Sequence, residues 1–294
     1  MKTSVYTYRY KPPVYHQAMI DPATSIGAVH LTVTDLARSM AFYTSRLGLA
    51  AHRQDARTAW LGADRVLLVL SENHQARHVE GTTGLYHFAL LVPSRVALAR
   101  ALRRLVDTST ELQGVADHGV SESLYLADPD GNGIEIYRDR RREEWPRVGG
   151  ALRMTVDPLD LDGLMRELEP GSDTRLTGTV MGHVHLRVAN LADAEAFYAG
   201  VLGFAVMQRY GHGALFVAAG GYHHHVGLNT WGGVGAPPSP PDAAGLDHVV
   251  VHLPDRAARD RVDAAIRAQR IPATTDDRGV LVRDPSGNAL LFTA

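Results

Sequence analysis

Hydrophobic and polar residues alternate in four short segments that are spread along the chain. They read AVHLTV, YHFALLV, HVHLRV and DHVVVHL. Alternation with a period of two predicts strands that bury one face. Each segment is followed by a stretch with helical spacing, such as DLARSMAFYTSRLG, and then by short strand-like runs that Gly or Asp-Gly turns separate. The pattern therefore predicts four βαβββ modules.

The two halves of the chain repeat each other. Residues 27–50 and 182–205 match at 13 of 24 positions, with an offset of 155. GLYHFALLVPSR matches GLDHVVVHLPDR in the same way, and DPDGNGIEI matches DPSGNALLF. A duplication of this kind predicts an α+β fold in two tandem domains, residues 25–139 and 179–294, joined by a linker at 140–178.

Composition narrows the class of protein. The 294 residues contain 45% hydrophobic residues and carry a formal net charge of −2, so there is no electrostatic case for binding nucleic acid or an anionic membrane. No window approaches a membrane span, and the N-terminal MKTSVYTYRYKPP has no signal-peptide pattern. The absence of cysteine excludes disulfides and thiolate metal sites. We therefore expect a cytoplasmic protein whose metal ligands, if any, are His, Asp or Glu.

The order and wording of the modules carry a family resemblance. Openings of the type HVHLRVANL…AFY…LGF, together with DPDGNGIEIY, resemble the vicinal oxygen chelate superfamily of glyoxalases, bleomycin-resistance proteins and extradiol dioxygenases. LYHFALLVPSR, DHGVSESLYLADPDGNGIEIYRDR and GGYHHHVGLNTW resemble the bacterial catechol 2,3-dioxygenase family in particular. The resemblance covers nearly the whole chain outside the first 25 residues and the linker. It implies that the modules pair into two cup-shaped sheets with helices outside.

Candidate metal ligands stand at matching positions of the modules. Pairing module 1 with 2 and module 3 with 4 leaves each cup one ligand short. Pairing module 2 with 3 instead collects His87, Glu135 and His183, and leaves the outer pair unable to hold a metal. The first strands of the four modules offer Ala28, His87, His183 and His248, and the last strands of modules 2 and 4 offer Glu135 and Leu291.

Two histidines and one carboxylate leave three coordination positions open on one face. This is the arrangement of non-haem Fe(II) sites that activate dioxygen. The resemblance implies Fe(II), with the open positions for the two oxygens of a catechol and for O2. Mn(II) can replace iron with the same ligands. The partners implied are thus a small aromatic diol and O2, and the product is a muconic semialdehyde-type compound.

The three histidines of GGYHHHVGLNTW read as part of a strand, in which neighbours point to opposite faces. The resemblance implies that one inward histidine of this run moves protons at the substrate, and it matches this role to His224. A register slip of one residue transfers the role to His223 or His225. The family also has a tyrosine ten residues before its carboxylate ligand, which is Tyr125 here, and a histidine upstream, which is His118. Tyr125 would orient the catecholate, and His118 would hydrogen-bond an oxygen of the substrate or of dioxygen.

Two other functions stay open at this point. A glyoxalase-type lyase or isomerase uses the same scaffold with a fourth protein ligand, which symmetry assigns to the last strand of module 3. A non-catalytic protein that sequesters a small molecule or drug uses the cups as pockets, although such relatives commonly lack the metal set. His185 and His30 point into the cups at non-ligand positions, and His248 is expected to be structural. Extradiol enzymes often form homo-oligomers, but the sequence shows no interface.

Overall fold

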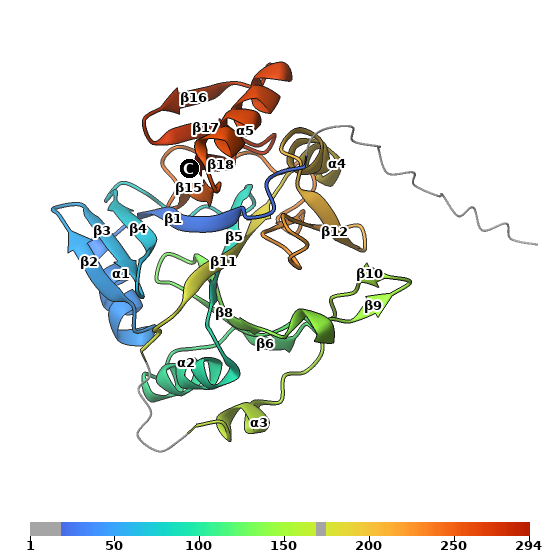
Figure 1. Cartoon of the computed structure of the whole chain (residues 1–294). Coiled ribbons are helices and arrows are strands. Elements are labelled where there is room, and N and C mark those ends of the chain that lie inside the picture. Colours follow the sequence, from blue (N-terminus) through green and yellow to red (C-terminus); the bar gives the residue numbers. More distant parts are fainter. Residues whose placement is uncertain (1–18, 169–174) are drawn as a thin grey trace, which may run out of the picture.

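Two eight-stranded sheets form the computed structural model, which describes residues 19–168 and 175–294 (Figure 1). The first sheet has the spatial order β16 (Ala273–Asp276), β17 (Gly279–Arg283), β18 (Ala289–Thr293), β15 (Gly245–His252), β1 (Ser25–Val33), β4 (Val66–Glu72), β3 (Thr58–Gly62) and β2 (Ala50–Gln54). The second has the order β12 (Ala205–Tyr210), β13 (Ala214–Ala218), β14 (Val226–Asn229), β11 (Val180–Arg187), β5 (Gly84–Leu91), β8 (Gly133–Asp139), β7 (Ser121–Ala127) and β6 (Gly114–Asp117).

Each sheet joins one module from each half of the chain. Modules 1 and 4 form the first sheet, and modules 2 and 3 form the second. The central pairs, β1 with β15 and β5 with β11, are antiparallel, and a parallel strand flanks each of the four central strands. The predicted α+β fold of four βαβββ modules is confirmed, and so is the pairing of module 2 with module 3. Hereafter the concave face of the second sheet is called cup A, and that of the first sheet cup B.

Helices occupy the periphery of the molecule (Figure 1). None in the described part of the chain is long and apolar enough to cross a membrane. The α-helices are α1 (Leu36–Ala41), α2 (Arg95–Asp107), α3 (Leu161–Met165), α4 (Leu191–Glu195) and α5 (Arg256–Ala268). The π-helical turns are η1 (Phe42–Arg46) and η3 (Ala196–Val201), the 3₁₀ turn is η2 (Arg142–Glu144), and a small hairpin contains β9 (Arg147–Val148) and β10 (Ala151–Leu152).

Strand alternation separates the core from the cup. In β11 the side chains of Val184 and Leu186 are fully buried in the hydrophobic cluster that also contains residues of α2. The intervening residues, His183, His185 and Arg187, therefore face cup A. Burial of the apolar face beneath helices thus fixes which side chains the strand presents to the concave side.

The repeated AFY and DPxGN motifs connect the two sheets. Tyr43 of η1 donates a hydrogen bond of 2.7 Å to Asp128, which lies in the turn before β8 of the other sheet. Tyr198 of η3 makes the equivalent bond of 3.1 Å to Asp284. All four side chains are buried. The motifs therefore recur because each one fastens a helix of one sheet to a turn of the other.

The segment between the halves forms a wall of cup A. Its backbone at Met154 exchanges two hydrogen bonds with the side chain of Gln208 in β12, at 2.6 and 3.2 Å. Asp157 pairs with Asp117 of β6 through an isolated β-bridge. These contacts join the two edge strands of the curved sheet. Residues 154–157 of the segment expected as a linker thus span the gap between the ends of the sheet.

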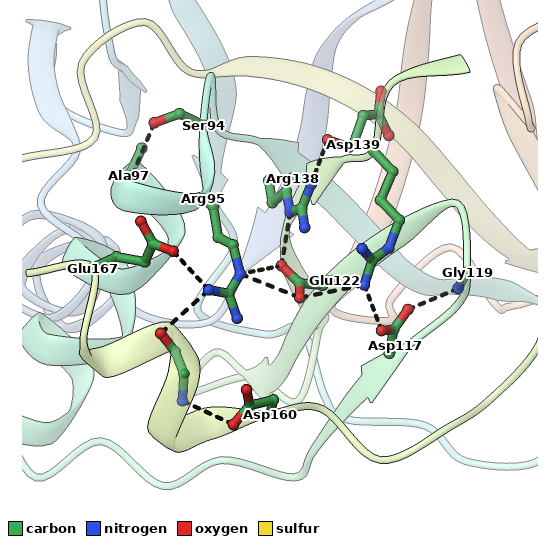
Figure 2. A network of polar contacts seen from close by, with 12 residues as sticks. Ser94, Arg95, Ala97, Asp117, Gly119, Glu122, Arg138, Asp139, Asp160 and Glu167 are labelled. Atoms are coloured by element: carbon green, nitrogen blue, oxygen red, sulfur yellow. Dashed lines mark hydrogen bonds and ion pairs between the residues drawn. The ribbon is translucent and has the colours of Figure 1, made fainter. Parts of the chain in front are cut away.

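A buried carboxylate on the outer side of β7 braces this wall (Figure 2). Glu122 accepts hydrogen bonds from Arg95 of α2 at 3.0 Å, from Arg138 of β8 at 2.7 Å and from Arg140 at 3.4 Å. Arg95 also binds the Gly163 carbonyl at 3.2 Å, which ties α3 into the network. Side chains alternate along β7, so the residue after Glu122 faces the cup. The network around Glu122 therefore holds in place a strand that lines cup A.

Candidate metal centre

The three predicted ligands converge in cup A. His87 comes from β5, Glu135 from β8 and His183 from β11. The Nε2 atoms of both histidines lie 3.0 Å from the same carboxylate oxygen, Glu135 Oε2. All three residues are buried, and they are the one group of potential metal donors found among the described residues. Parallel pairing of β5 with β8 and antiparallel pairing of β5 with β11 bring them together across about a hundred residues of sequence.

The donor spacing fits a metal ion. Bonds of about 2.1 Å at right angles place neighbouring donors about 3.0 Å apart. The Nε2 of His87 is 3.0 Å from the carboxylate, yet its angle is unsuitable for a hydrogen bond, so this buried atom has no hydrogen-bond partner among the described residues. The Ser123 hydroxyl donates to the other oxygen of Glu135 at 2.6 Å. Ser123 thus holds one carboxylate oxygen, and the second lies at 3.0 Å from the Nε2 atoms of both histidines, where a metal would replace the hydrogen bond to His183.

The protonation states also suit metal binding. Burial alone would raise the pKa of Glu135, but His183 and His87 hold that pKa well below its ordinary value. Burial lowers the pKa of His183 to about 4, and Glu135 only partly offsets this. An ionised carboxylate and a neutral imidazole are the forms that bind metals, because protonated ligands must first lose their protons.

A fourth ligand is absent from the position where symmetry would place it. The strand pairs Ala89–Glu135 and His185–Gly227 are related by the pseudo-twofold axis between β5 and β11. Gly227 therefore stands where the second half would supply a carboxylate. A Cβ at this glycine would lie 2.9 Å from the His185 ring, so that ring covers the position. The site is a set of three donors on one side.

The histidine run is a turn and not part of a strand, which corrects the prediction from sequence. Strand β14 begins only at Val226, because Gly220 and Gly221 adopt positive φ angles of 57° and 67° that end the preceding strand in a turn. The structure places His224 on the cavity of cup A, with its ring 4.1 Å from that of His183. The side chains of its two histidine neighbours bond to protein groups instead.

Hydrogen bonds define the tautomer of His224. The Nε2 of His223 lies 2.8 Å from Asp139 and donates to that carboxylate, so its Nδ1 is an acceptor. The Nδ1 of His224 is 2.8 Å from this acceptor and must carry the proton. The Nε2 of His224 consequently has a free lone pair. Burial, followed by the nearby His183 and His223, lowers the pKa of His224 well below its ordinary value, which keeps the ring neutral.

His118 and Tyr125 lie together on the opposite wall of the cavity. The Nδ1 of His118 donates to the Thr155 carbonyl at 2.7 Å, so its Nε2 accepts from the Tyr125 hydroxyl, also at 2.7 Å. Both nitrogens of His118 are therefore engaged. Burial and the charge of Glu135 raise the pKa of Tyr125 well above its ordinary value, so its hydroxyl keeps its proton.

The centre opens into a cavity of about 460 Å³. This volume lies in the range of 300 to 1,000 Å³ that is typical of small-molecule sites. His185, which the strand alternation directs into the cup, lines the cavity. The sequence did not reveal the remaining walls, which come from the segment between the halves and from the rim: Tyr86, Met154, Thr155, Val156, Arg187, Tyr210, Phe216 and Trp231.

No equivalent centre is found in cup B among the described residues. His248 stacks on His30 with ring centroids 3.9 Å apart, and its Nδ1 lies 2.6 Å from Asp247. The other ligand positions hold Ala28 and the buried Leu291. The outer pair of modules thus presents one ligand-like histidine, with an alanine and a leucine at the other two positions.

Comparison with known proteins now places the chain in a family. A family model described as the Glyoxalase/Bleomycin resistance protein/Dioxygenase superfamily matches residues 25–136 and 180–292. The chain belongs to this superfamily. Its resemblance to the vicinal oxygen chelate proteins, inferred from motifs, is thereby confirmed.

Individual members of the superfamily are similar over most of the chain. A catechol-2,3-dioxygenase of Bacillus subtilis (strain 168) is 44% identical over 275 residues, which cover 91% of this chain and 96% of that protein. A crystal structure of a Bacillus subtilis protein, provisionally described as a dioxygenase, is 14% identical with a TM-score of 0.64, and covers 94% of this chain and 86% of its own. Glyoxalase I of Zea mays is 16% identical with a TM-score of 0.57, over 92% of both chains. At these identities the two solved structures support the fold alone.

Proposed function

We propose that this protein is an extradiol dioxygenase that uses Fe(II) and O2 to open the ring of a catechol. The observation that carries the proposal is the convergence of two histidines and one glutamate on a cavity that a further histidine, His224, also lines. The relative at 44% identity, a catechol-2,3-dioxygenase, supports the same chemistry.

The protein residues would hold the metal by three donors. His87, Glu135 and His183 would bind it, and the donor set also accommodates Mn(II). A bound Fe(II) would supply Lewis acidity that lowers the pKa of a catechol hydroxyl, and a redox centre for the reaction with O2.

Proton transfer falls to His224. Its neutral ring presents a free Nε2 lone pair to the cavity, so it can accept the proton that a catechol hydroxyl releases. Its Nδ1–H is fixed by His223, which is in turn fixed by Asp139. This chain keeps the basic nitrogen directed at the substrate and can stabilise the imidazolium that forms.

Tyr125 would orient the substrate from the opposite wall. The hydroxyl hydrogen is committed to His118, so the oxygen retains lone pairs that can accept a hydrogen bond from a catechol hydroxyl. His118 is itself held by the Thr155 carbonyl. In this arrangement His118 acts on the substrate through Tyr125.

The glyoxalase-type alternative is less well supported. It calls for a fourth protein ligand from the last strand of module 3, where the structure has Gly227 beneath the His185 ring. A purely sequestering protein would have no use for three converging donors.

Metal analysis and oxygen uptake test the proposal together. Protein purified anaerobically and loaded with Fe(II) should contain one metal ion per chain and consume one O2 per catechol, with a yellow product. Zn(II)-loaded protein should bind catechol without oxygen uptake. Glu135→Gln should lose both metal and activity, whereas Glu122→Gln, on the outer face of the neighbouring strand, should keep its metal. Iron binding without oxygen uptake across a panel of substituted catechols would refute the function.

A further inference from the structure

Arg187 is the one arginine or lysine among the described residues that line the cavity, and Glu135 is the one aspartate or glutamate. Arg187 lies at the end of β11, on the same face as His183 and His185. Its guanidinium is therefore on the wall that runs from the metal ligands toward the mouth of the cup. A cavity with a single cation outside the metal centre is polarised along its length.

No carboxylate pairs with Arg187 within the described structure. Its Nη1 donates to the Leu85 carbonyl at 2.6 Å, and its guanidinium carbon lies 5.1 Å from the centre of the Tyr86 ring. These contacts use only part of its five N–H donors. Burial lowers the pKa of Arg187 below its ordinary value, yet a guanidinium keeps its charge. Burying a cation without an anion costs free energy. Arg95, by contrast, binds two carboxylates.

The side chain is held ready to bind. A Cβ at Gly232 would lie 3.2 Å from Arg187 Cδ, so this glycine leaves room for the arginine stem. The backbone carbonyl of Arg187 accepts a hydrogen bond of 3.2 Å from Asn288. The guanidinium contacts with Leu85 and Tyr86 restrain the long side chain before any ligand arrives, which lowers the entropic cost of binding.

The guanidinium is separated from the metal centre by one aromatic ring. Tyr86 lies between them, with its ring 5.2 Å from that of His87. An irregularity in the pairing of β5 with β11 turns Tyr86 toward the cup, beside the ligand that follows it. A ring that chelates the metal would thus have a substituent on its far side directed along this wall.

We propose that Arg187 binds a carboxylate carried on a short side chain of the catechol ring, so that the preferred substrates are anionic, substituted catechols. The inference rests on the proposed function and names the substrate class of the same site. The charges agree with it. A divalent metal with one glutamate matches a catecholate monoanion, and the remaining positive charge of Arg187 calls for a second negative group. The cavity of about 460 Å³ has room beside one six-membered ring for such a substituent.

A matched pair of substrates tests the proposal. 3,4-Dihydroxyphenylacetate and its methyl ester have the same ring and chain and differ in charge. In the Fe(II)-loaded protein, Arg187→Gln should lower kcat/KM for the acid by roughly 10- to 100-fold, mainly through KM, and should change the ester by less than about threefold. Arg187→Lys should recover part of the loss, because it restores the charge without the planar fork.

Calorimetry of the metal-free protein gives an independent readout. The wild type should bind the acid more tightly than the ester, with an advantage that shrinks in high salt, and Arg187→Gln should remove this difference. Arg53→Gln is the control, because Arg53 also stacks on an aromatic ring, Trp60, at 4.4 Å but lies in the other sheet. It should leave both ligands unaffected.

Equal affinity of the wild-type protein for acid and ester, or an equal loss of both in Arg187→Gln, would overturn the proposal and leave the dioxygenase function intact. Failure to cleave any catechol would instead count against the proposed function, and the metal-free binding data would still decide the role of Arg187. If Arg187→Gln melts at a much lower temperature than the wild type, the preference of the wild-type protein for the acid over the ester, and its decrease in high salt, decide the proposal without a variant.

Discussion

Cup A and cup B have the same strand order and differ in three of four residues at equivalent positions. Cup A has His87, Glu135, His183 and Gly227 there, and cup B has His248, Leu291, Ala28 and Val69. In cup A two histidines share one carboxylate oxygen, whereas in cup B the single ligand-like histidine stacks on His30 and pairs with the adjacent Asp247. The fold thus supplies the geometry of the site, and the chemistry depends on which side chains occupy a few inward positions.

A second difference concerns the connection that precedes β4 in cup B and β14 in cup A. In cup B only residues 63–65 connect β3 to β4, whereas residues 219–225 connect β13 to β14 in cup A. The longer connection contains the three histidines and presents His224 to the cavity. Cup A therefore differs from cup B both in the residues at its ligand positions and in the longer turn that carries His224.

The largest expected effect comes from replacing one ligand-like histidine in each cup. His183→Ala should abolish metal binding and lower oxygen uptake with catechol by more than about 10³-fold, because two donors cannot replace three. His248→Ala should keep the metal and nearly all activity, since its ring stacks on His30 and lies beside Asp247 in the other sheet. Metal content by mass spectrometry and oxygen electrode traces check this. Metal loss in His248→Ala alone would invert the assignment of the two cups.

The turn histidines give the next effect. Asp139→Asn can donate to His223 Nε2, which would move the proton of that ring to Nδ1 and force His224 to present an N–H to the cavity. We expect kcat to fall by roughly 10²-fold with the metal retained, close to the loss in His224→Gln. Steady-state kinetics on iron-loaded protein measure it. A normal kcat in Asp139→Asn with a low kcat in His224→Gln would separate the two residues and contradict the proposed chain.

Part of this arrangement could be predicted from the sequence. Alternation in HVHLRV separates Val184 from His183 without ambiguity, and the requirement for a complete ligand set selects the pairing of modules 2 and 3. Strand register then brings Glu135 to both histidines. These features are local or follow from the repeat, so the sequence alone predicts them.

Other features depend on long-range contacts that have no periodic signal. The wall made by Met154 and Thr155 exists because two edge strands need partners, and no spacing in the sequence announces it. The histidine run was read as a strand because its neighbours are apolar, while Gly220 and Gly221 impose a turn. The isolation of Arg187 from acids is visible only when every neighbouring element is in place.

Gly227 provides a smaller test of the difference between the cups. Gly227→Ala introduces a Cβ that would lie 2.9 Å from the His185 ring and makes cup A more like cup B, where Val69 fills the position. We expect the free energy of unfolding to fall by about 1–3 kcal/mol and KM to rise several-fold, because His185 must shift into the cavity. Denaturant titration and kinetics test this. Gly27→Ala is the control, because its Cβ would lie 2.5 Å from a histidine ring, His252, in the other sheet, and it should change stability without changing KM. An unchanged KM in Gly227→Ala would show that His185 does not define the cavity wall.

The smallest expected effect is the pH dependence of cup B. Burial, and then the neighbouring His248, lower the pKa of His30 to about 4, whereas the unfolded chain has the ordinary value of 6.5. Between these values the unfolded state binds more protons than the folded state, so His30 makes stability fall as the pH drops from about 6.5 toward 4. After a discount for solvent screening of this half-buried ring, the loss between about pH 7 and pH 5 should be about 1 kcal/mol. His30→Phe keeps the stacking surface and should remove this part of the pH dependence in metal-free protein. A His30→Phe variant that is as acid-sensitive as the wild type would place the sensitivity in the metal ligands of cup A instead. In that case bound metal, which holds His183, should mask the loss of stability at low pH.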